Sequence, residues 1–190
     1  MPITTQHVRD TLDAYLTQRP DEKDQLAVLT EVLDEAADSI VSRKKYRGHA
    51  TAGAILLRPD GPILQIEHKA LGTWLFPGGH VEDSDTSLLD AALRELAEAT
   101  GIAADQVRFD SGIPLHIDAH PIPANPVKGE DAHQHFDFRF LFRTGNTAVE
   151  LQEEEVTNYT WQFADSLTTE PLRSRVLGTI RPNTGTDAPQ

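Results

Sequence analysis

Residues 78–102 read GGHVEDSDTSLLDAALRELAEATGI, a glycine-containing loop followed by a run with helical spacing. An apolar stripe at positions i, i+4 and i+7 of this run is formed by Leu89, Leu93 and Leu96. Glycine commonly ends helices, because it adopts the left-handed conformation without steric cost, and Gly101 stands at the end of the run. The stretch therefore predicts a loop, a helix over about residues 85–100 and a stop at Gly101.

The other side of this helix carries charged side chains whose spacing suits a divalent cation. Arg94 and Glu98 are four residues apart and Glu95 and Glu98 three apart, so the three share one side. Two carboxylates one turn apart can bind a hard cation, which prefers oxygen ligands. Gly79 permits close approach of the backbone, whose carbonyl can complete the coordination. On the residues alone, a solvated face with a weak Arg94–Glu98 ion pair stays open.

The segment resembles the signature of the Nudix hydrolase family, G-x5-E-x7-R-E-U-x-E-E-x-G-U, where U is aliphatic. The literal matches are Gly79, Arg94, Glu95, Leu96, Glu98, Gly101 and Ile102. The resemblance implies an α/β fold, namely an α/β/α sandwich with a mixed sheet, and hydrolysis of a nucleoside diphosphate linked to another moiety. It also implies a Mg²⁺ or Mn²⁺ ion bound by Glu98, Glu95 and the Gly79 carbonyl. Arg94 would orient the glutamates, and Glu95 would act as general base.

Two positions depart from that signature. Asp85 stands where glutamate is usual, and eight residues instead of seven separate it from Arg94. We expect the insertion to be tolerated if Asp85 still reaches Arg94. Ala99 replaces the second glutamate of the E-E pair, and its methyl group supplies no oxygen to a metal. Glu82 and Glu153–Glu155 are candidate replacements, although the latter run also suits a solvated segment. A non-catalytic nucleotide-binding or metabolite-binding module therefore stays open as the alternative function.

A second group of candidate residues lies on strands that are rich in histidine. Residues 133–142, HQHFDFRFLF, alternate phenylalanines with polar residues, so the two sets face opposite sides of a strand. We expect the phenylalanines in the core. An earlier run alternates in the same way and carries His116, Asp118 and His120. Three interpretations stay open: a solvated strand face, a histidine and aspartate site for a transition metal, or a substrate-binding surface formed by Arg139, His135 and Asp137.

The rest of the chain predicts a helical N-terminal extension at 1–45, a Nudix-like domain at 46–180 and a flexible tail at 181–190. Two amphipathic segments on either side of Pro20 predict a helical hairpin in the extension. Further strands are predicted at 50–57, 63–66, 107–117, 136–143 and 159–163. A loop is predicted at 120–132 and a last helix at 171–180.

The amino-acid composition argues against some classes of binding partner for this chain. The 190 residues include 17 Lys and Arg against 30 Asp and Glu, a net charge of −13, which argues against a nucleic-acid partner. A small nucleotide or nucleotide-like substrate remains compatible, because a bound metal can supply local positive charge. The absence of cysteine excludes disulfides, thiolate zinc sites and a cysteine nucleophile. With no long apolar run and no secretory signal, we expect no membrane partner and a cytoplasmic location. The apolar stripe of the first helix leaves a homodimer open.

Overall fold

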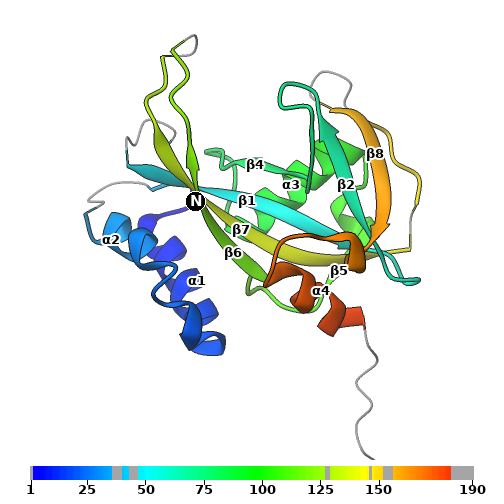
Figure 1. Cartoon of the computed structure of the whole chain (residues 1–190), viewed down its shortest axis with the longest axis horizontal. Helices are drawn as coiled ribbons and strands as arrows, with labels where there is room; N and C mark the ends of the chain where they lie inside the picture. The colour runs from blue at the N-terminus through cyan, green and yellow to red at the C-terminus, as the bar shows by residue number, and fades with distance from the viewer. Residues whose placement is uncertain are drawn as a thin grey trace, which may run out of the picture.

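Figure 1 shows the computed structural model, which describes residues 2–35, 40–42, 47–126, 129–145, 147–151 and 156–180. The described strands form one mixed sheet against which α-helices pack, so the predicted α/β fold class is confirmed. The α-helices of the described residues are α1 (Thr5–Gln18), α2 (Ala27–Glu35), α3 (Leu88–Thr100) and α4 (Leu172–Ile180). Short 3-10 helices are η1 (Pro20–Glu22), η2 (Ala104–Gln106) and η3 (Ala164–Ser166).

The sheet is built around one long central strand, β1. Its strands are β1 (Gly48–Leu57), β2 (Pro62–His68), β3 (Thr73–Leu75), β4 (Gly78–His80), β5 (Val107–Phe109), β6 (His116–Ile122), β7 (His133–Thr144) and β8 (Val156–Phe163). One edge of β1 pairs in parallel with β7, and the other edge pairs antiparallel with β4 and β2. One edge of β2 pairs with β1 at Ile63 and Leu57 and further along with β3, while β8 pairs along the other edge from Pro62 to His68. β5 and β6 both pair antiparallel with β7.

Alternation along β1 and β7 gives the sheet an apolar face and a partly polar face. On the apolar face, buried alanines of β1 and phenylalanines of β7 share one hydrophobic cluster with α3. This set comprises Ala50, Ala52, Ala54, Phe136, Phe138, Phe140 and Phe142. The other face carries polar side chains at one end, in the register His49↔His135, Thr51↔Asp137 and Gly53↔Arg139. Its other end is apolar and packs with α4.

Most predicted elements are confirmed, with shifted ends. The signature helix runs from Leu88 to Thr100 and is followed by Gly101, whose φ of 70° is the left-handed conformation expected of a stop. The predicted strand at 107–117 is wrong, because it is divided into β5 and β6. The interruption at 110–115 contains Gly112 and Pro114, and proline cannot donate to a strand ladder. The predicted loop at 120–132 is partly wrong as well, because β6 continues to Ile122.

The N-terminal helices pack on the same hydrophobic cluster as the sheet. A buried polar network also ties them to α4: the Tyr15 hydroxyl donates to Glu22 Oε2 at 2.5 Å and accepts from Arg175 Nη1 at 2.6 Å. Arg175 also forms an ion pair with Glu22. The second helix of the predicted hairpin begins at Ala27, after the 3-10 turn that follows Pro20. The predicted domain boundary at 45 and 46 and the tail at 181–190 lie outside the described residues.

Candidate active site

The site is built around Arg94, which joins α3 to the loop before it. Its Nε lies 2.9 Å from Asp85 Oδ1 and its Nη2 lies 3.0 Å from Asp85 Oδ2, while Nη2 also donates to the His80 carbonyl at 2.8 Å. Asp85 is 5% exposed and accepts a further hydrogen bond from the Glu82 backbone N–H. The bond to Asp85 is the main cause that raises the pKa of Arg94. Asp85 therefore reaches Arg94 despite the extra residue.

Three glutamates surround the remaining nitrogen of this guanidinium. Arg94 Nη1 donates to Glu95 Oε1 at 3.0 Å and to Glu98 Oε2 at 2.9 Å. Glu82 Oε1 lies 4.0 Å from the same atom. The Glu95 side chain is largely buried, whereas the Glu98 and Glu82 side chains are about half exposed. Arg94 thus fixes the Glu95 and Glu98 carboxylates on one side of α3, with Glu82 of the preceding loop beside them.

Gly79 brings the backbone of β4 against Glu95. A Cβ built on Gly79 would lie 2.6 Å from each oxygen of the Glu95 carboxylate, closer than real side chains approach. Only glycine therefore allows Glu95 to occupy this position. The three residues predicted to bind the metal, Gly79, Glu95 and Glu98, all lie around this point and line the same cavity.

The donors around Arg94 fit a hard divalent cation in chemistry, because they are carboxylate oxygens beside the backbone of β4 at Gly79. Ala99, one of the two positions that depart from the signature, contributes no oxygen. Glu82 is the candidate replacement that lies beside this group, with its Oε1 4.0 Å from Arg94 Nη1. The other candidates named from the sequence, Glu153–Glu155, lie outside the described residues.

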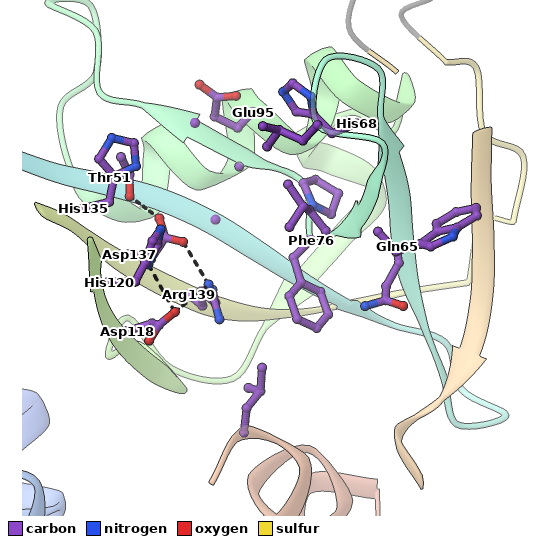
Figure 2. Close-up of a pocket in the computed structure, with 18 of the residues that line it drawn as sticks. Thr51, Gln65, His68, Phe76, Glu95, Asp118, His120, His135, Asp137 and Arg139 are labelled. Carbon is purple, nitrogen blue, oxygen red and sulfur yellow. Dashed lines mark hydrogen bonds and ion pairs between the residues drawn. The ribbon is translucent and has the colours of Figure 1, made fainter. Parts of the chain in front are cut away.

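The glutamates and the polar face of the sheet line one cavity of about 1160 Å³. Figure 2 shows Glu95 on α3 and the labelled side chains of β6 and β7 around this space. The predicted substrate-binding residues Arg139, His135 and Asp137 are all part of its lining. The structure therefore brings together two groups of residues that are about 40 positions apart in the chain.

Arg139 is held by two carboxylates. Its Nη2 donates to Asp137 Oδ2 at 2.9 Å and to Asp118 Oδ2 at 3.1 Å, and Asp137 also accepts a hydrogen bond from the Thr51 hydroxyl. The imidazole of His120, whose Nδ1 lies 3.3 Å from Asp118 Oδ2, and the charge of Arg139 lower the pKa of Asp118 to about 2 against the effect of burial. Burial raises the pKa of Asp137, but Arg139 and Thr51 outweigh it and the pKa is lowered. Both carboxylates are therefore ionised, and the positive charge of Arg139 is locally neutralised.

Sequence reasoning missed two features, one beside the cavity and one in its wall. His49 of β1 is 1% exposed, and its ring centroid lies 4.6–5.0 Å from those of His80, His133 and His135. Its signal was the alternation of His49 and Thr51 with alanines, in a strand that otherwise reads as apolar. The second feature is an apolar rim on the cavity, where exposed side chains belong to Leu71, Trp74 and Leu75.

The family model of the NUDIX domain matches residues 47–178. The chain is 37% identical over 103 residues to a probable DHNTP pyrophosphohydrolase of Lactococcus lactis subsp. cremoris, covering 54% of this chain and 58% of that protein. It is 30% identical over 144 residues to the m7GpppN-mRNA hydrolase NUDT17 of Danio rerio, covering 70% of this chain and 47% of that protein. The matches thus span about half the length of these curated relatives.

Solved structures show the same fold. The dihydroneopterin triphosphate pyrophosphohydrolase of E. coli superposes with a TM-score of 0.53 at 17% identity, covering 72% of this chain and 98% of that one. A NUDIX-family hydrolase from Clostridium perfringens superposes with a TM-score of 0.51 at 18% identity, covering 70% and 93%. These structural similarities show the fold. The family model matches more than half of the chain and therefore shows the family. The chain belongs to the Nudix domain family.

Proposed function

We propose that the chain hydrolyses the pyrophosphate bond of a nucleoside diphosphate, or a similar compound, linked to another moiety. The observation that carries this proposal is the convergence of Glu95 and Glu98 on Arg94 beside Gly79, in the wall of a cavity of about 1160 Å³. We further propose that Glu95, Glu98 and the Gly79 carbonyl hold Mg²⁺ or Mn²⁺, with Glu82 in place of the oxygen that Ala99 lacks. Such an ion, when bound, neutralises phosphate oxygens and activates water.

The residues of the chain have separate roles in this proposal. Glu95 is the general base that accepts the proton of the attacking water, because it is the most enclosed of the three glutamates. Arg94 is a positioning residue: its bonds to Asp85 fix the guanidinium, and the guanidinium in turn holds Glu95 and Glu98. The half-exposed Glu98 faces solvent, as a ligand that shares an ion with substrate and water must.

The polar face of the sheet is proposed to bind the organic part of the substrate. Arg139 is paired with Asp118 and Asp137, so this wall presents more negative than positive charge. It therefore suits hydroxyl or amine donors of a sugar or base better than phosphate oxygens. The apolar rim at Leu71, Trp74 and Leu75 suits one face of an aromatic ring.

The names of the relatives support a class of substrate and leave the individual compound open. One is named as a probable DHNTP pyrophosphohydrolase and another as an m7GpppN-mRNA hydrolase, so the groups attached to the phosphates differ between them. A small-molecule substrate agrees with the net charge of −13, which disfavours long polyanions. No helix in the described parts of the chain is both long and apolar enough to cross a membrane. The cytoplasmic location and the homodimer stay predictions.

The second candidate is a module that binds a nucleotide or metabolite without turnover. Ala99 favours it, because loss of a carboxylate weakens the binding of a hard cation. The two functions are separated by measuring phosphate-product release from nucleoside triphosphates, nucleotide sugars, ADP-ribose, dinucleoside polyphosphates and dihydroneopterin triphosphate. Each is tested with Mg²⁺ and with Mn²⁺, and with the Glu98→Gln variant as control. Metal-dependent turnover that Glu98→Gln abolishes supports the hydrolase. If no compound of the panel is hydrolysed but a compound still shifts the thermal unfolding of the protein, the result supports the binding module.

A further inference from the structure

A cluster of histidines lies at one end of the polar face of the sheet, apart from the glutamates of α3. Within the part of the chain that the structure describes, one group of three or more potential metal ligands has its ligand atoms within 4.8 Å of one another: His49, His133 and His135. His49 is buried, and His133 and His135 are partly exposed. The proposed hydrolase activity makes no use of His49 or His133.

The sheet itself brings these imidazoles together. β1 and β7 run in parallel with His49 opposite His135, so the two side chains emerge side by side on the same face. His133 lies two residues before His135 and therefore projects from the same face of β7. The ring centroids of His49 and His133 are 5.0 Å apart, and those of His133 and His135 are 5.1 Å apart.

A contact with the backbone fixes the tautomer of one of the rings. His133 Nδ1 lies 2.8 Å from the backbone carbonyl of Asp131. A carbonyl can only accept a hydrogen bond, so Nδ1 carries the hydrogen, and in the neutral ring the lone pair is on Nε2. Metal-binding histidines commonly donate their second ring N–H to a backbone carbonyl in this way, which fixes the tautomer and the plane of the ring.

We propose that His49, His133 and His135 form a three-imidazole site for a transition metal of the Zn²⁺ class. Imidazole suits zinc and its neighbours, whereas Mg²⁺ prefers oxygen, so this site and the glutamates of α3 select different ions. Tetrahedral zinc places its ligating nitrogens about 3.4 Å apart, so modest side-chain rotations bring the three nitrogens onto one ion.

The fourth coordination position of this site is left to water or to an oxygen of a bound ligand. Three protein ligands with an open fourth position are typical of zinc that contacts a substrate. His135 lines the cavity, so an ion bound to it lies at the cavity wall. Two further imidazoles lie beside the cluster: the ring centroid of His80 is 5.0 Å from that of His49, and the ring centroid of His120 is 5.7 Å from that of His135.

The test is the visible absorption of Co²⁺, which is strong in tetrahedral and weak in octahedral coordination. The full chain is purified without a polyhistidine tag and stripped with a chelator. It is then titrated with Co²⁺, and Zn²⁺ is added to displace the Co²⁺. We expect one tetrahedral Co²⁺ per chain, displaced stoichiometrically by Zn²⁺. His133→Ala should weaken the affinity by at least about 100-fold, since loss of an outer-shell partner alone costs about 10–100-fold.

Three further variants make the result specific. His49→Ala tests the buried ligand, and thermal unfolding without metal establishes whether it still folds; His133→Ala stands in for it if it does not. His68→Ala is the matched control, because His68 lines the same cavity outside the cluster and its loss should leave the spectrum unchanged. Glu98→Gln should also leave it unchanged. Weak octahedral absorption in the unmodified chain, or a spectrum that survives His133→Ala but not Glu98→Gln, would overturn the proposal.

Discussion

The guanidinium of Arg94 binds both carboxylate oxygens of Asp85, with Nε 2.9 Å from Oδ1 and Nη2 3.0 Å from Oδ2. This pair occupies one edge of the guanidinium and leaves Nη1 for Glu95 and Glu98. Aspartate is one methylene shorter than the glutamate usual at this place, and the loop before α3 is one residue longer. The Arg94–Asp85 pair shows that the shorter side chain and the longer loop are compatible with each other.

Replacing Asp85 by alanine should lower the free energy of unfolding by about 3 kcal/mol, because it leaves the largely buried Arg94 without its main partner. The measurement is urea unfolding. Asp60→Ala is the matched control, since Arg58 also binds Asp60 with two hydrogen bonds, at 2.9 and 2.7 Å, but in an exposed turn. Its loss should cost about 1 kcal/mol or less. Equal costs for the two variants would contradict the structural role given to Asp85.

Replacing Gly79 by alanine should reduce turnover while leaving the fold stable. The new Cβ would collide with the Glu95 carboxylate, which can swing away at little cost because it is the end of a flexible side chain. Displacement of a reacting group by about 1 Å can cost about 100-fold in rate. Gly112→Ala is the control, because nothing lies within 4 Å of its Cβ position. Steady-state kinetics and thermal unfolding of both variants check the prediction, and an unchanged rate for Gly79→Ala would contradict it.

Restoring the missing carboxylate with Ala99→Glu should tighten binding of Mg²⁺ or Mn²⁺ and raise the rate at limiting metal. The reason is that affinity for a hard cation rises with the number of carboxylate ligands. The metal concentration that gives half-maximal rate is the quantity to measure. An unchanged or higher value would mean that the ion is bound by other residues, and it would put the assignment of Glu98 in doubt.

The sequence predicts the signature helix and the charged residues that share a side with Arg94 well, because the patterns that indicate them lie within one segment of the chain. The spacing of leucines, the stop at Gly101 and the i, i+4 placement of charges all lie within one segment. The alternation of phenylalanines in β7 is equally local, and the structure confirms that they are core residues. Both groups of candidate site residues can therefore be identified from local sequence patterns alone.

The relation between the groups could not be predicted, since it depends on strand pairing across long separations. The parallel pairing of β1 with β7 joins His49 to His135, and no local pattern marks His49 as a partner of the later histidines. The strand predicted at 107–117 is divided because Gly112 and Pro114 interrupt it, although the residues on both sides favour an extended conformation. The pairing of Arg139 with Asp118 depends in the same way on the register of β6 against β7.

The free energy of unfolding should decrease in acid because of His116, whose side chain is buried: the residue is 5% exposed. Its Nδ1 accepts a hydrogen bond from Arg175 at 2.6 Å, so the ring is neutral. Burial, then the charge of Arg139, lowers its pKa to about 4, against the opposing effect of Asp118 and Asp137. The unfolded chain, in which the pKa of histidine is about 6.5, therefore binds more protons between about pH 6.5 and pH 4.

The free energy of unfolding should consequently decrease as the pH falls through that window, by at most about 3 kcal/mol from this group. Other groups also titrate there, so the comparison is with His116→Gln, which keeps an acceptor but cannot gain a proton. Urea unfolding at a series of pH values should give a shallower slope for the variant. Identical slopes for the two proteins would show that His116 is not protonated on unfolding.

The most direct test of the account is the turnover number of Glu95→Gln with the best substrate from the panel, at saturating Mg²⁺ or Mn²⁺. Glutamine keeps the shape of the side chain but cannot accept the proton of water. Asp90→Asn, which changes an exposed acid elsewhere on α3, is the control. We predict a loss of about 10²–10⁴-fold for Glu95→Gln and little change for the control. A Glu95→Gln protein with the rate of the unmodified chain would contradict the assignment of this site.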